Sequence, residues 1–491
     1  MRFGDPAWGT PVVPRRKRGE SMGSTFFGLQ IAFSGLKAQR TVMETISHNI
    51  ANASTPGYTR QRVVLVTSPP YPLETSLYFH VKHQQGTGVD AARIVRVADA
   101  FIDGQLREQE GLLAEKRQMA DVISQVEGIF GEPGDQGLGA MLAAFFNGWE
   151  ELTLNPDSLA VRRSLLYQGE ALAGAFQRVG RQIAALQGNL DFELVSSVSS
   201  INQYAAYIAD INGKIRRMAG SGVNPNDLLD ERDRLVTELR KLLAVRVVEQ
   251  DNGEISVFAG NRALVFGDAS YRVTVEQMPT GFHRLVWEGD SRPVEMGGGT
   301  LAAVVRMRDE YLPGLEEELD RLVSTLAERV NALHAGGYDL RGDPVAGTSF
   351  ESFFLGSTVR DIRVNPELVA DPSGIAASLG TGPGDAENAR RIAALRDEPA
   401  MFGNYTFLDY YRGVVARVGT DARAMYAEAD NTEALTRQVR QWRESVSGVN
   451  LDEEMIRLQE AVHAYQAAAR AVTAMDDAIA TVIQSMGIVG R

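Results

Sequence analysis

The chain has 491 residues, of which 44% are hydrophobic and 23% are charged, a balance typical of a folded protein with about three domains. Its formal net charge of -13 excludes general affinity for nucleic acid or anionic membranes. The absence of cysteine excludes disulfide bonds, thiolate metal sites and cysteine nucleophiles, and no apolar run approaches the roughly 20 residues that span a bilayer.

The start of the chain carries the only dense basic patch, at residues 15–18. We interpret residues 1–21 as a disordered tail or a mis-called start before Met22. An alternative interpretation is a cleavable secretory signal, because the mainly apolar residues 25–33 follow the basic patch. A helical period that continues through the supposed cleavage region argues against a signal, and the sequence leaves both interpretations open.

Residues 22–60 are predicted to form a heptad helix and the turn that ends it. Apolar side chains repeat every seven residues along one face, with a second partial row beside them. These rows contain Leu29, Phe33, Leu36, Met43 and Ile50. One face of the helix is therefore apolar and needs a partner.

The end of this helix is marked by Pro56 and Gly57, because proline disfavours helix in the preceding residue and glycine supplies turn geometry. Asn49, Asn52 and Tyr58 lie close to this end. Amide and phenol side chains there can satisfy exposed backbone groups or bridge to a neighbouring subunit. We expect these five residues to belong to an assembly interface.

The central part begins with residues 61–97, which are predicted to be an extended connector. Residues 98–244 have a helical pattern and form the N-terminal part of a multi-helix domain. From residue 245 the pattern changes to strict alternation, and the Asn252-Gly253 pair predicts a hairpin. Residues 245–303 are therefore predicted to form a small antiparallel β domain.

A long helix is predicted over residues 304–337, followed by an irregular or β segment over residues 338–385, which is rich in glycine and proline. Residues 386–446 return to a helical pattern and complete the helical domain. The fold class is thus mainly α, with long terminal coiled-coil helices, a multi-helix domain and an inserted antiparallel β domain.

The last segment, residues 447–491, carries the strongest periodic signal in the chain. Five heptads give a helix of roughly 50 to 55 Å. Its two apolar rows are interrupted only at Asp476 and contain Leu451, Met455, Leu458, Val462, Tyr465, Val472, Ile479, Ile483 and Met486. A thin apolar stripe buries little on its own. We therefore expect the two chain ends to pack on each other and on neighbouring copies.

Residues 47–61 read SHNIANASTPGYTRQ, and residues 86–89 read GTGV. Both segments resemble flagellar rod, hook and hook-associated proteins, the axial family of the bacterial flagellum. Four interior segments, at residues 149–162, 226–236, 331–340 and 447–458, are similar to the branch of this family that lies between hook and filament. The β region looks compact, so an outermost domain is expected to be reduced or absent.

This resemblance implies a structural subunit that polymerises through its paired terminal helices. The implied partners are copies of itself, the hook protein and the next hook-associated or filament subunits. It also implies type III export without signal cleavage, with the export apparatus and an export chaperone that binds the C-terminal helix, and a final location outside the cell at the hook-filament junction. The implied alternative is another axial subunit of the hook or distal rod.

Enzymatic and metal-binding sites find no support in the sequence. The acidic cluster around Asp230 is interpreted as helix-surface charge, since Asp230 and Arg234 are four apart. The six histidines are scattered, and the glycine-rich segments lack the lysine of a phosphate loop. We expect no catalytic residue, cofactor, metal, nucleic acid or membrane partner, and a secreted adhesin or wall hydrolase remains the alternative from another class.

Overall fold

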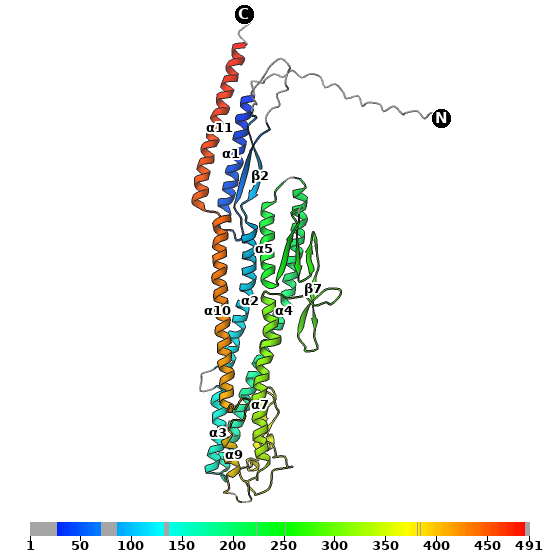
Figure 1. Cartoon of the computed structure of the whole chain (residues 1–491), viewed down its shortest axis with the longest axis vertical. Coiled ribbons are helices and arrows are strands. Elements are labelled where there is room, and N and C mark those ends of the chain that lie inside the picture. The colour runs from blue at the N-terminus through cyan, green and yellow to red at the C-terminus, as the bar shows by residue number, and fades with distance from the viewer. Residues whose placement is uncertain are drawn as a thin grey trace, which may run out of the picture. The chain divides into compact units, whose positions relative to one another are not determined.

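The computed structural model describes residues 27–69, 86–131, 137–221, 223–250, 252–380, 382 and 384–486, and at residues 485 and 486 it describes the backbone alone (Figure 1). The predicted tail and the side chain of Met486 lie outside this part. The chain divides into two compact units, one made of residues up to 98 and from 447, the other of residues 99–446. Each unit is described by itself.

The first unit brings the two chain ends together. Helix α1 (Phe27–Ala51) packs along helix α11 (Leu451–Met486), and strands β1 (Gln61–Thr67) and β2 (Val89–Arg96) form an antiparallel ribbon that packs against α1. The segment predicted as an extended connector therefore contains a paired ribbon. Its register shifts between Val64 and Leu65, where the ribbon is irregular.

The second unit begins with four helices: α2 (Ala100–Phe130), α3 (Leu138–Leu154), α4 (Leu159–Ala219) and α5 (Asn226–Leu242). Side chains cap the starts of two of them. Asp99 accepts hydrogen bonds from the first amides of α2, and Ser158 does so for α4. With 61 residues, α4 is about 90 Å long and contacts most other elements of this unit.

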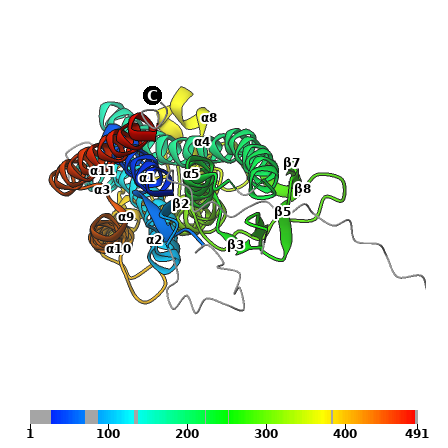
Figure 2. The same ribbon diagram turned by 90° about the horizontal axis from the view of Figure 1, so that it is seen from above.

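The β region is inserted between α5 and α6. Strands β3 (Val245–Glu249), β4 (Ile255–Ala259), β5 (Arg262–Phe266) and β6 (Ala269–Ser270) form one antiparallel sheet, and β7 (Val273–Gln277) pairs with β8 (His283–Trp287). Two amides of α4 fasten these strands: Asn212 donates to the carbonyls of Ile255 and Gly267, and Asn202 bonds the backbone of Val273. Figure 2 shows β3, β5, β7 and β8 grouped on one side of the unit.

Helix α6 (Thr300–Arg306) continues through a π-helical turn, η1 (Met307–Tyr311), into α7 (Leu312–Ala335). This run starts at residue 300 because Gly299, with φ of 83°, precedes it, and a Cβ there would lie 2.8 Å from the carbonyl oxygen of Leu242. Short elements follow before the last helix of the unit. They are β9 (Phe354–Leu355), β10 (Arg363–Val364), α8 (Pro366–Ala370), η2 (Pro372–Gly374), α9 (Glu387–Ala394) and α10 (Phe407–Ser447).

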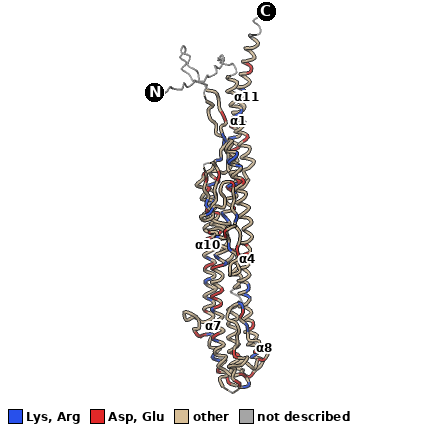
Figure 3. Tube along the Cα trace, turned by 90° about the vertical axis from the view of Figure 1, so that its right-hand side faces the viewer, with Lys and Arg blue, Asp and Glu red and all other residues tan. Residues whose placement is uncertain are grey.

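The predicted fold class, mainly α with a small antiparallel β insertion, is confirmed. Acidic and basic residues are interspersed along the helices of the second unit rather than gathered by sign (Figure 3). The surface-pair interpretation of Asp230 is wrong, because its side chain is buried, as is that of Arg232. Arg232 donates to the carbonyl of Gly253, so this helix face supports the β3–β4 turn.

A buried histidine sits in the aromatic core of the second unit. His334 accepts a hydrogen bond from the amide of Ala376 through Nε2, and its Nδ1 lies 3.1 Å from the carbonyl oxygen of Glu351. The rings of Trp149 and Phe353 contact it. Burial, with a smaller effect from the Arg162 charge, lowers the pKa of His334 to about 4, so the folded protein holds this ring neutral.

We expect the second unit to lose stability as the pH falls from about 6.5 through 4. The unfolded chain gains a proton on His334 in this window and the folded chain does not, which is worth about 3 kcal/mol at most. Urea unfolding followed by tryptophan fluorescence at pH 7 and pH 4 measures this loss. The control is His334→Gln, which cannot titrate; equal pH slopes for the two proteins would contradict the prediction.

Candidate assembly site at the paired chain ends

Asn49, near the end of α1, holds the first unit together with four hydrogen bonds. Its side-chain nitrogen donates to the carbonyl of Gln61 at 2.9 Å and to the carboxylate of Glu454 at 2.8 Å. Its side-chain oxygen accepts from the amide of Gln61 at 2.9 Å and from the hydroxyl of Tyr58 at 2.8 Å. With 1% of its surface exposed, Asn49 uses its full bonding capacity in the interior.

Glu454 supplies the carboxylate from the first turn of α11, and only 1% of its surface is exposed. Besides Asn49 it accepts from Arg457 at 3.1 Å. Asn450 caps the helix by accepting from the amides of Asp452 and Glu453. Because a buried carboxylate without partners is costly, the start of α11 is bound to the end of α1.

The turn after α1 is built from its own side chains. Asn52 donates back to the carbonyl of His48 at 3.0 Å, and Thr55 donates to the Asn52 side chain at 3.2 Å. Gly57 has φ of 84°, which only glycine adopts readily. The ring of Tyr58 then packs edge-on against His48, and this contact aims its hydroxyl at Asn49.

The β ribbon is fixed to α1 at its other end by Ser34. Its hydroxyl donates to the carbonyl of Ile31 at 2.8 Å and accepts from the amide of Val89 at 3.2 Å. Gly88, with φ of 109°, lets this contact form, because a Cβ there would lie 2.1 Å from the Ser34 hydroxyl. At residues 86–89 the chain therefore passes very close to α1 as it enters β2.

The face of α11 that packs on α1 carries small residues. Ala468 lies opposite Gly35, and Met475 packs on Gly28, with its sulfur 3.0 Å from where a Cβ would be. Glu454, Ala461, Ala468 and Met475 are seven apart and form this seam. Glycine and alanine let the two helix axes approach closely.

The predicted apolar rows of α11 lie beside the seam rather than in it. At about 3.6 residues per turn, the row that contains Met455 and Ile483 is turned by about 100° from the seam. Met455 is 48% exposed and Ile483 is 64% exposed. Val462 of the same row is partly buried. In the row closer to the seam, Leu458, Tyr465 and Val472 are partly buried, Ile479 is buried, and Leu451 at the start of the helix is exposed.

The predicted row of α1 lies in a similar position. Leu29, Leu36, Met43 and Ile50 are partly buried, and Phe33 is 59% exposed. The fully buried positions of α1 are instead Ala38, Thr45, Ile46 and Asn49. Pro56 and Gly57 are exposed, and Asn52 and Tyr58 are partly buried. Packing within one chain therefore leaves much of both predicted rows uncovered.

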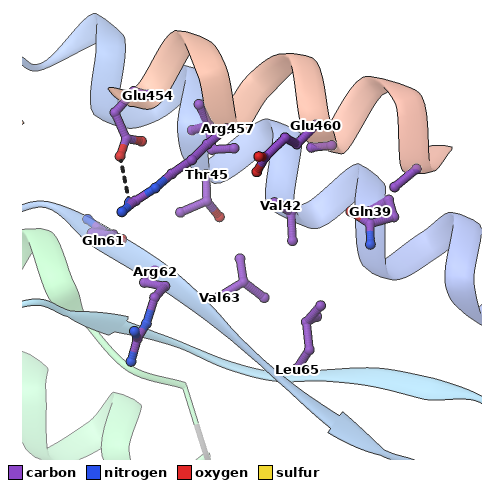
Figure 4. Close-up of a pocket in the computed structure, with 13 residues that line it drawn as sticks. Gln39, Val42, Thr45, Gln61, Arg62, Val63, Leu65, Glu454, Arg457 and Glu460 are labelled. Carbon is purple, nitrogen blue, oxygen red and sulfur yellow. Dashed lines mark hydrogen bonds and ion pairs between the residues drawn. The ribbon is translucent and has the colours of Figure 1, made fainter. Parts of the chain in front are cut away.

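A groove of about 350 Å³ opens where α1, β1 and α11 meet (Figure 4). Its apolar wall consists of Val42, Ile46, Val63, Leu65, Ala461 and Ala464. Arg62 projects from β1 on one side of the groove, and Glu460 lies on the α11 side (Figure 4). The groove is an apolar surface rimmed by charges.

Sequence reasoning singled out Asn49 and Tyr58 but not three other residues of this site. Gln61, Ser34 and Glu454 act at this site through contacts with distant segments. The spacing of Asn450 and Glu453 is that of a capping pair and could have marked the start of α11. No sequence signal shows that the neighbouring Glu454 is buried.

Buried polar side chains have a structural role in two of the interior segments that resemble axial proteins. Arg162 donates to the carbonyls of Pro156 and Ile375, and Asn331 bonds the backbone of Phe353 and Phe354. These contacts hold loops in place. Within the described residues there is no cluster of three metal-ligating side chains, and none of the described helices has the length and apolarity of a membrane span.

Three family models match the chain, two at its ends and one between them. Residues 29–59 match the flagella basal body rod protein model, residues 443–485 match the flagellar basal body rod FlgEFG protein C-terminal model, and residues 123–350 match the flagellar hook-associated protein FlgK helical domain model. The rod models cover α1 and α11, and the helical-domain model covers much of the second unit. The two ends of the chain are thus similar to flagellar rod proteins, and its middle part is similar to the hook-associated protein FlgK.

Two flagellar proteins and one solved structure are similar to this chain over most of its length. Flagellar hook-associated protein 1 of Bacillus subtilis (strain 168) is 29% identical, covering 96% of this chain and 100% of the relative. Flagellar hook-associated protein 1 of Salmonella typhimurium is 25% identical over 89% of this chain and 96% of the relative. The solved structure of the flagellar hook junction protein FlgK from Burkholderia pseudomallei has the same fold, with a TM-score of 0.62 and 18% identity, and covers 70% of this chain.

Replacing Asn49 is expected to loosen the pairing of the chain ends. Asn49→Ala leaves the buried Glu454 carboxylate without its amide donor, which costs about 2 to 3 kcal/mol. Hydrogen exchange of the α1 amides should then be faster by the corresponding factor. Asn52→Ala is the control, since the Asn52 contacts are local to the turn. Protection equal to that of the unchanged protein would contradict this role for Asn49.

Gly88→Ala is expected to detach the β ribbon from α1, because the new methyl group collides with Ser34 at an unfavourable φ. The strain costs roughly 2 kcal/mol. Limited proteolysis within the ribbon and hydrogen exchange of β2 measure the effect. At Gly86 a Cβ meets no atom within 4 Å, so Gly86→Ala is the matched control. Equal behaviour of both variants would show that the Ser34 contact carries no stability.

Proposed function

We propose that this chain is a structural subunit of the bacterial flagellum that joins the hook to the filament and polymerises through its paired terminal helices. Two observations support the proposal. The family models place rod-type segments at both ends of the chain around a FlgK helical domain. The structure pairs those ends while leaving several residues of the apolar rows of α1 and α11 exposed.

The exposed rows are the observation that carries the assembly role. Each large apolar side chain moved out of water contributes about 1.5 to 3 kcal/mol. Phe33, Met455 and Ile483 remain largely in water in the single chain. Copies of the chain, the hook protein and the next hook-associated or filament subunit are the partners that cover them.

The same proposal assigns a structural role and no catalytic activity. The protein works outside the cell at the hook-filament junction, after passage through the flagellar type III export channel. An export chaperone that covers the exposed row of α11 would keep it from premature association. The assembly residues are those of the predicted rows and of the turn at Pro56 and Gly57.

A hook or distal rod subunit is the second candidate, since the rod-type models at both ends fit such proteins equally. The match of residues 123–350 to the FlgK helical domain favours the junction. Electron microscopy of a strain that lacks the gene separates the two. Loss of a junction protein leaves hooks without filaments, whereas loss of a hook or rod subunit removes the hook itself.

Deleting residues 451–491 is expected to abolish filament formation while leaving the second unit folded, because α11 belongs to the first unit alone. The variant is produced in the strain that lacks the gene, with the full-length chain as control. Filaments are counted by electron microscopy, and circular dichroism of the purified variant reports its helices. Normal filaments with the truncated chain would refute assembly through the terminal helices.

A further inference from the structure

The groove between α1, β1 and α11 has an apolar wall of aliphatic side chains, which water solvates poorly. At about 30 Å³ per water, its volume holds on the order of ten waters against aliphatic side chains. Displacing such water by apolar side chains is favourable. Its walls include the backbone-proximal methyl groups of Ala461 and Ala464, so a partner can approach α11 closely there.

One charge beside the groove has no partner among the described residues. Arg62 is exposed, and the structure gives it neither a hydrogen bond nor an ion pair within the part of the chain it describes. The other arginine of the groove, Arg457, is already engaged by Glu454. A docking partner that brings a carboxylate beside apolar side chains therefore matches the groove.

The same chain carries a carboxylate beside an exposed apolar side chain near the C-terminal end of α11, at Asp476 and Ile483, which we call the Asp476–Ile483 ridge. Ile483 is 64% exposed, and Asp476 lies seven residues before it on the same row. Asp476 is also exposed and has no ion-pair partner among the described residues. The exposed row of α1 suits the groove less well, because Lys37 and Arg40 beside Phe33 have the same sign of charge as Arg62.

We propose that the groove of one copy receives the Asp476–Ile483 ridge of α11 from a second copy, with Asp476 pairing to Arg62. The inference rests on the proposed function, since it needs many copies in one assembly. Groove and ridge are different surfaces, so a copy that docks its ridge still offers its own groove, and a head-to-tail contact repeats from copy to copy. About 28 Å of helix separates Ala464 from Ile483, so one copy cannot fill its own groove.

The absence of cysteine allows a direct test by disulfide cross-linking. The full-length variant with Ala464→Cys and Ile483→Cys is produced in the strain that lacks the gene, and flagella are isolated and oxidised. A disulfide requires Cα atoms within about 7 Å, so these two cysteines cannot bond within one chain. The expected result is a ladder of cross-linked copies on non-reducing gels.

The matched control replaces Ile483→Cys by Thr481→Cys, which lies on another face of α11 at almost the same height. It should give several-fold less cross-linking. Arg62→Asp should lower the cross-linked fraction of the Ala464/Ile483 pair, and adding Asp476→Arg should restore it. Filaments that contain the variant but show no cross-link above the control would overturn the groove contact and leave the junction role intact, whereas absence of the chain from flagella would overturn the junction role itself.

Discussion

The hydrogen bond from Asn49 to Glu454 joins two segments that lie 405 residues apart in the chain. Both side chains are buried, so each depends on the other to replace the water it has lost. Asn49 also bonds both backbone groups of Gln61, and the same side chain thus sets the end of α1, the start of β1 and the position of α11. The rest of the first unit is arranged around this contact.

The seam between the terminal helices contains several small side chains and leaves out most of the large apolar ones. Gly28, Gly35 and Ala468 let α1 and α11 lie close together, whereas Phe33 and Ile483 point away from the contact. A pair of helices joined in this way is specific but buries little apolar surface. The large residues remain available to a neighbouring subunit, which is the property that an axial polymer requires.

The second unit uses buried polar side chains in the same way. Arg162 donates to carbonyls in two separate loops, Asn212 bonds β4 and the β5–β6 turn to α4, and His334 joins the end of α7 to Ala376. Each of these side chains forms hydrogen bonds with backbone atoms, as buried polar groups generally do. The interior motifs that resemble other axial proteins are therefore explained by the folding of loops.

The sequence by itself determined the mainly helical class, the inserted β region, the turn at Pro56 and Gly57 and the apolar rows of both chain ends, because periodicity and turn chemistry are local. It also predicted Asn49 as an interface residue, and in the structure this side chain bonds Gln61 and Glu454 within the chain. Only the tertiary structure decided that Glu454 is its partner, that Asp230 is buried, and that the seam runs beside the predicted rows. Those facts depend on which distant segment covers a given helix face. Helical spacing shows which face is apolar but not which segment packs on it.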